Sequence, residues 1–230
     1  MKKIYSADTV KKIYDSGIFD RMVGADKSID VPPKILQRFF TGDIAYIKNR
    51  LHKNKVTLEV GCGFGRLLTH LSAVSKKVTG IDFCKSQIKK SGEMTKELAN
   101  VKTKLMRAER MSFKNNSFDQ ALCLNNSLGN MPGIETRVIQ EMKRVTKSGG
   151  KIIIRVFADN KAIKHAQHEN YRRLGFTGIQ NLGRAVVTDE GFYSRRFTRK
   201  DLRMLFKKAG LKPLLYKDGE IGYIAEATKE

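Results

Sequence analysis

The chain has 230 residues, of which 40% are hydrophobic and 30% charged, and this length suits one domain with a substantial core. No apolar run is long enough to span a membrane, and three widely spaced cysteines argue against a disulfide framework or a zinc site. They favour a reducing, cytoplasmic setting. The net charge of +22 either attracts polyanionic partners or is simply solvated, because lysine and arginine are spread along the whole chain.

Residues 1–50 are expected to form a helical cap. A short helix is predicted over residues 8–15, and Ser16-Gly17 ends it. Pro32-Pro33 begins a second helix, since proline suits a first helical turn. Hydrophobic residues then follow at helical spacing: Ile35, Leu36, Phe39 and Phe40.

The next segment is the most informative part of the chain. A strand over residues 56–60 runs into a turn that contains three glycines: Gly61, Gly63 and Gly65. Such a turn lets a ligand approach the backbone where a Cβ atom would block it. A second strand over residues 78–81 ends in Asp82, so a carboxylate stands beside the turn and can accept hydrogen bonds from a ribose. The pattern predicts a cofactor that carries a nucleoside.

Two common nucleotide-binding loops do not match this turn. The dinucleotide fingerprint G-x-G-x-x-G needs its third glycine one position later, where this chain has Arg66. A Walker loop would end in G-K-S or G-K-T, and the sequence contains neither. The nucleoside is therefore expected in a glycine turn of another kind.

Strands and helices alternate after the glycine turn, which predicts a parallel sheet with helices on both faces. A strand is predicted at residues 120–124, and Gly149-Gly150 is expected to end a helix and open the next strand. A helix over residues 159–174 and a hairpin follow. Thr198 and Asp201 have the spacing of a capping box, so another helix begins there. Two antiparallel strands close the chain: residues 213–216 and 221–227.

The sequence E-V-G-C-G-F-G at residues 59–65 resembles motif I of the class I S-adenosylmethionine-dependent methyltransferases, and Asp82 matches that family's ribose-binding acid. The resemblance covers residues 56–157 well and residues 198–227 more loosely, and it points to small-molecule members of the type 11 and type 25 kinds. It implies a Rossmann-like, seven-stranded, mostly parallel sheet with helices on both faces, an antiparallel last strand and a helical N-terminal cap.

The same resemblance implies one methyltransferase domain over residues 1–230, with S-adenosyl-L-methionine as its cofactor. Its expected parts are a helical cap (1–50), a cofactor-binding core (51–157), an insertion or lid (158–197), and a closing helix with strands (198–230). Ligands bind at the carboxyl edge of the sheet in such folds, and the insertion is expected to lie over that edge.

The resemblance further implies which residues contact the cofactor. The glycine turn takes the methionine amine, Asp82 binds the ribose, and Phe83 packs on the adenine. Arg107 stands where many members carry an adenine-binding aspartate, so the backbone of the next two residues is expected to contact the base. The full implied set is Tyr14, Glu59, Gly61, Cys62, Gly63, Gly65, Asp82, Phe83, Ala108, Glu109 and Asn125.

Tyr14 belongs to this set through a separate similarity. Tyr14-Asp15 and Phe19-Asp20 resemble an N-terminal segment that folds over the cofactor in some small-molecule methyltransferases. A helix that only packs against the domain explains the same residues equally well. Both interpretations stay open at this point.

The sequence gives less specific evidence for residues that contact the methyl acceptor than for residues that contact the cofactor. Asn126 is expected near the transferred methyl group, although Asn125-Asn126-Ser127 also suits a helix start. His165 and His168 are either bases or exposed helix residues, and they lack a third ligand for a metal. Tyr193 is a further catalytic or substrate-binding candidate. Arg195 either binds an anionic substrate or is a solvated arginine of the hairpin.

The predicted activity is methyl transfer to a nitrogen or oxygen nucleophile of a small molecule, mainly by proximity and orientation. The alternative is an RNA or ribosome-associated methyltransferase, which the net charge favours. Against it, the sequence has neither the D/N-P-P-Y/F motif nor the Pro-Cys nucleophile of nucleic-acid methyltransferases, and aromatic residues make up only 8%. A non-catalytic protein that keeps the fold is the third class.

Overall fold

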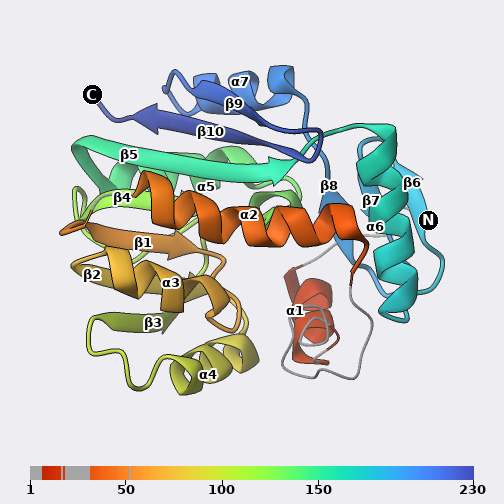
Figure 1. The fold of residues 1–230 in the computed structure, drawn as a ribbon, viewed down its shortest axis with the longest axis horizontal. Coiled ribbons are helices and arrows are strands. Elements are labelled where there is room, and N and C mark those ends of the chain that lie inside the picture. The colour runs from red at the N-terminus through yellow and green to blue at the C-terminus, as the bar shows by residue number, and fades with distance from the viewer. Residues whose placement is uncertain (1–6, 17, 19–31, 52) are drawn as a thin grey trace.

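Figure 1 shows a computed structural model of the chain, which describes residues 7–16, 18, 32–51 and 53–230. Its centre is a seven-stranded sheet in the order β3-β2-β1-β4-β5-β10-β9. The strands are β1 (Val56–Val60), β2 (Lys77–Asp82), β3 (Val101–Leu105), β4 (Phe118–Cys123), β5 (Thr146–Phe157), β9 (Leu214–Asp218) and β10 (Gly222–Thr228). Strands β1 to β5 are parallel, and β10 is antiparallel to both of its neighbours. The predicted fold class is confirmed.

Helices cover both faces of this sheet (Figure 1). Helices α2 (Lys34–Arg50) and α3 (Arg66–Val74) pack on one face, while α5 (Glu135–Val145) and α7 (Arg199–Lys208) pack on the other. Side chains of β5 pack on both faces of the sheet. Ile152 and Ile154 pack with α5 and α7, while Ile153 packs with α2 and α3. Helix α4 (Lys85–Met94) follows β2. No helix among the described residues is long and apolar enough to cross a bilayer.

A small separate layer stands at one end of the sheet. It contains α6 (Lys161–Arg173) and a three-stranded antiparallel sheet of β6 (Gln180–Leu182), β7 (Ala185–Val187) and β8 (Tyr193–Arg195). The predicted hairpin is β7–β8, whereas β6 was not predicted. The N-terminal helix α1 (Ala7–Asp15) packs here, since Ile13 belongs to one apolar cluster with Tyr171 and Phe192.

The prediction for the double glycine is wrong. Helix α5 ends at Val145, and β5 already begins at Thr146, whose hydroxyl donates a hydrogen bond to the Met142 carbonyl. The glycines lie inside β5, where its pairing with β4 shifts register. A Cβ atom on Gly150 would lie 2.7 Å from the Asp119 carbonyl oxygen, so glycine is needed for close strand approach rather than for a helix end.

The capping-box prediction is confirmed. The Thr198 hydroxyl accepts a hydrogen bond from the Asp201 backbone N–H, and the Asp201 carboxylate accepts one from the Thr198 backbone N–H. This reciprocal pair fixes the start of α7 directly after β8 and Phe197. Ala158 and Phe197 also form an isolated bridge, so the chain leaves and re-enters the main domain at neighbouring points.

Candidate active site

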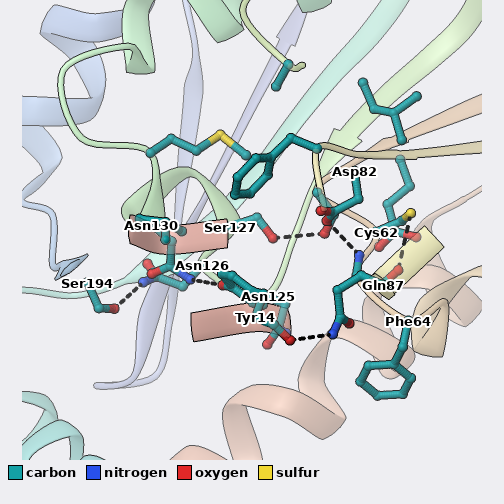
Figure 2. Close-up of a pocket in the computed structure, with 18 of the residues that line it drawn as sticks. Tyr14, Cys62, Phe64, Asp82, Gln87, Asn125, Asn126, Ser127, Asn130 and Ser194 are labelled. Atoms are coloured by element: carbon teal, nitrogen blue, oxygen red, sulfur yellow. Dashed lines mark hydrogen bonds between the residues drawn. The ribbon is translucent and has the colours of Figure 1, made fainter. Parts of the chain in front are cut away.

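A cavity of about 270 Å³ opens at the carboxyl ends of β1, β2 and β4. The chain order reverses between β1 and β4, and parallel sheets form a crevice at such a switch point. Figure 2 shows Asp82, Cys62 and Gln87 toward one end of the cavity and Ser194, Asn126 and Asn130 toward the other, with Tyr14 between them. The cavity therefore joins the glycine turn to the layer formed by α1, α6 and β8.

The glycine turn is anchored to β2 and leaves its outer face open. The backbone N–H groups of Gly61 and Cys62 both donate to the Ile81 carbonyl, at 2.9 and 3.0 Å. Gly61 has a φ of +75°, and a Cβ atom there would lie 2.9 Å from the Ser127 Cβ. At Gly63 an added Cβ would meet only the Gln87 side-chain oxygen, at 3.7 Å. A ligand can therefore approach the backbone at Gly63.

Gly65 has a different role from the one predicted. It does not line the cavity, and it precedes α3 with a φ of +96°. A Cβ atom at this position would lie 3.2 Å from the Ser91 Cα in α4. The third glycine of the turn thus allows α4 to pack closely against the start of α3.

Asp82 holds the turn with its carboxylate. One oxygen accepts the Gly63 N–H at 3.0 Å, and the other accepts the Cys84 N–H at 2.9 Å. Burial raises the pKa of this carboxyl group, and the two backbone N–H groups act in the opposite direction. A carboxylate has about four acceptor positions, so both oxygens can accept further hydrogen bonds from the hydroxyls of a ligand.

Three buried polar atoms beside the turn have no hydrogen-bond partner: Glu59 Oε2, Arg66 Nη2 and Asn125 Oδ1. Arg66 is fixed by a hydrogen bond of 3.2 Å from Nη1 to the Phe40 carbonyl, and its Nη2 lies 3.7 Å from Asp43. In the sequence, Arg66 is recognisable only as a mismatch to the dinucleotide fingerprint, and its place in the site was not predicted. Buried polar atoms are normally satisfied, so this cluster is suited to the charged end of a ligand.

Glu59 gives the site a pH dependence. Burial raises the pKa of its carboxyl group to about 8, although the Arg66 charge opposes the shift. Between roughly pH 5 and pH 8 the folded protein keeps a proton that the unfolded chain has released, so the free energy of unfolding falls as pH rises through this window. Glu59→Gln is expected to remove that fall and to be more stable than wild type at about pH 9, by at least about 1 kcal/mol.

Urea unfolding from about pH 5 to pH 9 would measure this effect. Glu97→Gln is the matched control, because the Glu97 side chain is 85% exposed and forms its ion pair with the exposed Lys96. A Glu59→Gln protein whose stability changes with pH as steeply as that of the wild type would contradict the assignment.

The residues that the sequence predicts to contact the adenine also line the cavity. Phe83, Ala108 and Glu109 are among its lining residues. Arg107, which occupies the family's aspartate position, donates a hydrogen bond from Nε to the Glu109 carboxylate. The arginine charge is therefore compensated by its neighbour.

The other end of the cavity is lined by side chains from five segments. We call this part the acceptor chamber and define it by Tyr14, Asn130, Phe157, Tyr171, Phe192 and Ser194. The Asn130 amide donates to the Tyr14 hydroxyl at 3.2 Å, and the Phe192 ring lies 5.0 Å from the Tyr171 ring. Phe19-Asp20, the second half of the predicted N-terminal segment, lies outside the described residues.

Asn126 lines the cavity, but its amide is used within the protein. Its oxygen accepts the Phe157 N–H at 3.0 Å, and its nitrogen donates to the Ser194 hydroxyl at 3.2 Å and to the Arg195 carbonyl at 3.3 Å. A short 3₁₀ helix, η2 (Ser127–Asn130), does begin here, yet no side chain caps it. The helix start expected as the alternative is therefore present without a side-chain cap, and the Asn126 amide instead ties β5 and β8 to the floor of the chamber.

The remaining candidates do not line the cavity. His165 is exposed on α6, whose buried positions include Asn170 and Tyr171, so the helix presents those residues to the chamber instead. His168 and Tyr193 also lie outside the lining, and no metal-binding group of three side chains occurs among the described residues. The prediction of His165, His168 and Tyr193 as catalytic groups therefore lacks support from their positions.

Arg195 is likewise engaged elsewhere. Its guanidinium lies 3.0 Å from Glu135, 3.3 Å from Asp201 and 4.7 Å above the Phe197 ring centre. These contacts satisfy its charge inside the fold. Arg195 also lies outside the cavity lining, so its binding of an anionic substrate stays a prediction that its position does not support.

The family description "Methyltransferase domain" matches residues 57–150. The match begins in β1 and ends in the glycine bulge of β5, so it contains the glycine turn, Asp82 and Asn125. Residues 57–150 are a class I S-adenosylmethionine-dependent methyltransferase domain.

Two curated methyltransferases are similar to this domain in sequence. A demethylmenaquinone methyltransferase of Geobacillus is 35% identical over 108 residues, which is 45% of each chain. A sterol 4-C-methyltransferase of Caenorhabditis elegans is 27% identical over 133 residues, which is 55% of this chain and 38% of that protein. The chain thus spans less than half the length of either relative.

A solved structure shares the fold of this chain outside residues 57–150 as well. The 1,6-didemethyltoxoflavin-N1-methyltransferase of Burkholderia thailandensis, determined with 1,6-didemethyltoxoflavin and S-adenosylhomocysteine, has a TM-score of 0.70 and 18% identity. The similarity covers 97% of this chain and 88% of that one, so it includes α1 and the layer of α6 to β8 as well as the methyltransferase domain.

The residues of this methyltransferase domain fit S-adenosylmethionine. The backbone at Gly63 is open to a ligand, and Asp82 has acceptor capacity for ribose hydroxyls. The unpartnered atoms of Glu59 and Arg66 suit an ammonium and a carboxylate, which are the two charged groups of the methionine end. The site thus provides groups for both ends of the cofactor.

Proposed function

We propose that the protein transfers a methyl group from S-adenosylmethionine to a nitrogen or oxygen atom of a small molecule. One observation carries the proposal: a single cavity is lined both by the glycine turn with Asp82 and by the acceptor chamber. A methyl group held over the glycine turn would therefore face the acceptor chamber. The names of the similar proteins, which refer to a menaquinone, a sterol and a toxoflavin, support a small molecule as the acceptor.

In this proposal the cofactor lies across the carboxyl ends of β1 and β2. Asp82 accepts hydrogen bonds from the ribose, and Phe83 packs against the adenine. At the methionine end Glu59 and the Gly61 backbone take the amine. Asn125, a member of the predicted set, offers its unpartnered oxygen to the same amine, and Arg66 extends the set because its Nη2 can donate to the carboxylate.

S-adenosylmethionine, when bound, supplies a methyl group on a positively charged sulfur. The acceptor atom forms the new bond with its own electron pair, the carbon–sulfur pair leaves with the sulfur, and an N–H or O–H acceptor releases its proton to water. The protein's contribution is to hold the acceptor in line and to exclude bulk water. The ionisable groups of the acceptor chamber are Tyr14 and Tyr171, and burial raises the pKa of both, to about 12 for Tyr171. They remain protonated at neutral pH, which favours catalysis by proximity.

Labelled-methyl transfer tests this function. The purified protein is incubated with methyl-labelled S-adenosylmethionine and an extract separated into small metabolites, RNA and protein. The expected label is in the small-metabolite fraction, and Asp82→Ala should remove most of it. Label confined to RNA would contradict the proposal and favour the alternative drawn from the net charge of +22. A cytoplasmic setting is part of the proposal, supported by three free, buried cysteines.

A further inference from the structure

The acceptor chamber is walled mainly by aromatic rings. Tyr171 and Phe192 lie edge to face with 5.0 Å between ring centres, and Phe157 contributes a third ring from the end of β5. Phe40 of α2 lines the cavity on the same side as Phe157, with which it shares an apolar cluster. Aromatic rings pack best against the face or edge of another flat ring. The walls therefore favour a planar acceptor over a flexible chain.

The chamber carries no charged side chain among the described residues that line it. The charged residues on the cavity wall all belong to the cofactor end: Glu59, Arg66, Asp82, Arg107 and Glu109. Arg195, the arginine that the sequence offered as a substrate-binding residue, is paired with Glu135 and Asp201 outside the lining. An ionised acceptor would lose its hydration here without gaining a counter-charge from a protein side chain, which is costly in a buried site.

One polar atom in the chamber is left for a ligand. The Asn130 amide nitrogen donates to the Tyr14 hydroxyl at 3.2 Å, while its oxygen, Oδ1, is buried and has no hydrogen-bond partner. A carbonyl oxygen can only accept, so the missing partner must be a donor. Figure 2 shows Asn130 beside Asn126 at the end of the cavity remote from Asp82. A ligand in the chamber that carries an N–H or O–H group would satisfy this oxygen.

We infer that the methyl acceptor is an uncharged, planar ring compound whose N–H or O–H group donates a hydrogen bond to Asn130 Oδ1. The inference rests on the proposed function, because it identifies the acceptor class of the same site. It requires three properties together: flatness for the aromatic walls, neutrality for the uncharged lining, and a donor for Asn130. A site that hydrogen-bonds a ligand group discriminates strongly against an analogue without it, because its own polar atom is then left unpaired.

Four ring compounds separate these properties. 2-Naphthol has all three, 2-fluoronaphthalene lacks the donor, 6-hydroxy-2-naphthoate keeps the donor but adds a charge, and decahydro-2-naphthol keeps the hydroxyl but is not flat. Binding of each is measured by calorimetry or saturation-transfer NMR on the full chain with S-adenosylhomocysteine present. We expect 2-naphthol to bind at least about tenfold more tightly than 2-fluoronaphthalene. This difference in affinity corresponds to one hydrogen bond to a buried acceptor, which only 2-naphthol can form. Weaker binding is also expected for the other two compounds.

Two variants test whether the Asn130 side chain causes the preference for a ligand that carries a hydrogen-bond donor. Asn130→Leu is expected to bind 2-naphthol and 2-fluoronaphthalene equally, because no acceptor remains. Asn49→Leu is the control, since it makes the same change on an exposed turn of α2. S-adenosylhomocysteine binding by each variant reports whether the cofactor end is intact. If Asn130→Leu does not fold, Asn130→Ala makes the same comparison.

The outcomes distinguish this inference from the proposed function. Failure of the wild-type protein to bind S-adenosylmethionine or S-adenosylhomocysteine would overturn the proposed function itself. Normal cofactor binding with tightest binding of 6-hydroxy-2-naphthoate or decahydro-2-naphthol, or with no bound ring compound at all, would overturn the acceptor class alone. Equal binding of 2-naphthol and 2-fluoronaphthalene to the wild type would show that Asn130 does not select a donor.

Discussion

Asp82→Ala is expected to weaken S-adenosylmethionine binding by about 1–3 kcal/mol, or roughly 5- to 150-fold in Kd. Two effects add in this variant. The ribose loses its acceptor, and the glycine turn loses the carboxylate that accepts the Gly63 N–H at 3.0 Å and the Cys84 N–H at 2.9 Å. Titration calorimetry with S-adenosylmethionine measures the change directly.

Asp119→Ala is the matched control for this variant. Asp119 also uses its carboxylate to accept a backbone N–H of the β1 region, that of Val56 at 2.7 Å, but it lies at the opposite end of the strand and pairs with Lys147. Its loss should leave cofactor affinity unchanged. If both variants bound S-adenosylmethionine as the wild type does, Asp82 would not be the ribose ligand.

Arg155→Met is expected to lower the free energy of unfolding by about 3–5 kcal/mol. The Arg155 side chain is 1% exposed, lies 2.9 Å from the fully buried Asp43, forms an ion pair with Asp218 and covers the Phe39 ring at 4.0 Å. Without the guanidinium, Asp43 would remain as a buried carboxylate whose other nearby cation, Arg66, is 3.7 Å away. The network joins α2 to β5 and β9, so its loss also loosens the helix that brings Phe40 to the cavity.

Urea unfolding tests this prediction against a surface arginine with a similar set of partners. Arg184 pairs with Asp159 at 3.1 Å and Asp201 at 3.3 Å, but its side chain is 49% exposed. Arg184→Met should cost about 1 kcal/mol or less. Asp43→Asn in the Arg155→Met background should recover part of the lost stability. Equal effects of the two arginine variants would contradict a dominant role for the buried network.

The parts of the site that sequence predicts are those with a strict local requirement. The glycine turn and Asp82 follow buried strands at fixed spacing, and the backbone geometry there leaves few alternatives, so strand, turn and acid could all be located before the structure was known. The alternation of strands and helices fixed the fold class for the same reason. The short β6 was missed because its three residues, Gln180–Leu182, are exposed and carry no hydrophobic alternation.

What was missed depends on contacts between residues far apart in the chain. Arg66 and Asn130 become site residues only because α2, η2 and α1 meet at the cavity. His165 was chosen for its chemistry, but the rotation of α6 places Asn170 and Tyr171 on the cavity instead. Asn126 was expected to face the substrate, whereas its amide satisfies backbone and side-chain groups of β5 and β8. A single sequence contains no signal for these pairings.

A crystal structure of the protein with S-adenosylhomocysteine tests the central claim most directly. It should place the ribose hydroxyls within hydrogen-bond distance of Asp82 and the amino-acid end against Gly61, Gly63 and Glu59, with the sulfur toward the acceptor chamber. Nucleoside density elsewhere, or a ribose that makes no contact with Asp82, would contradict the assignment.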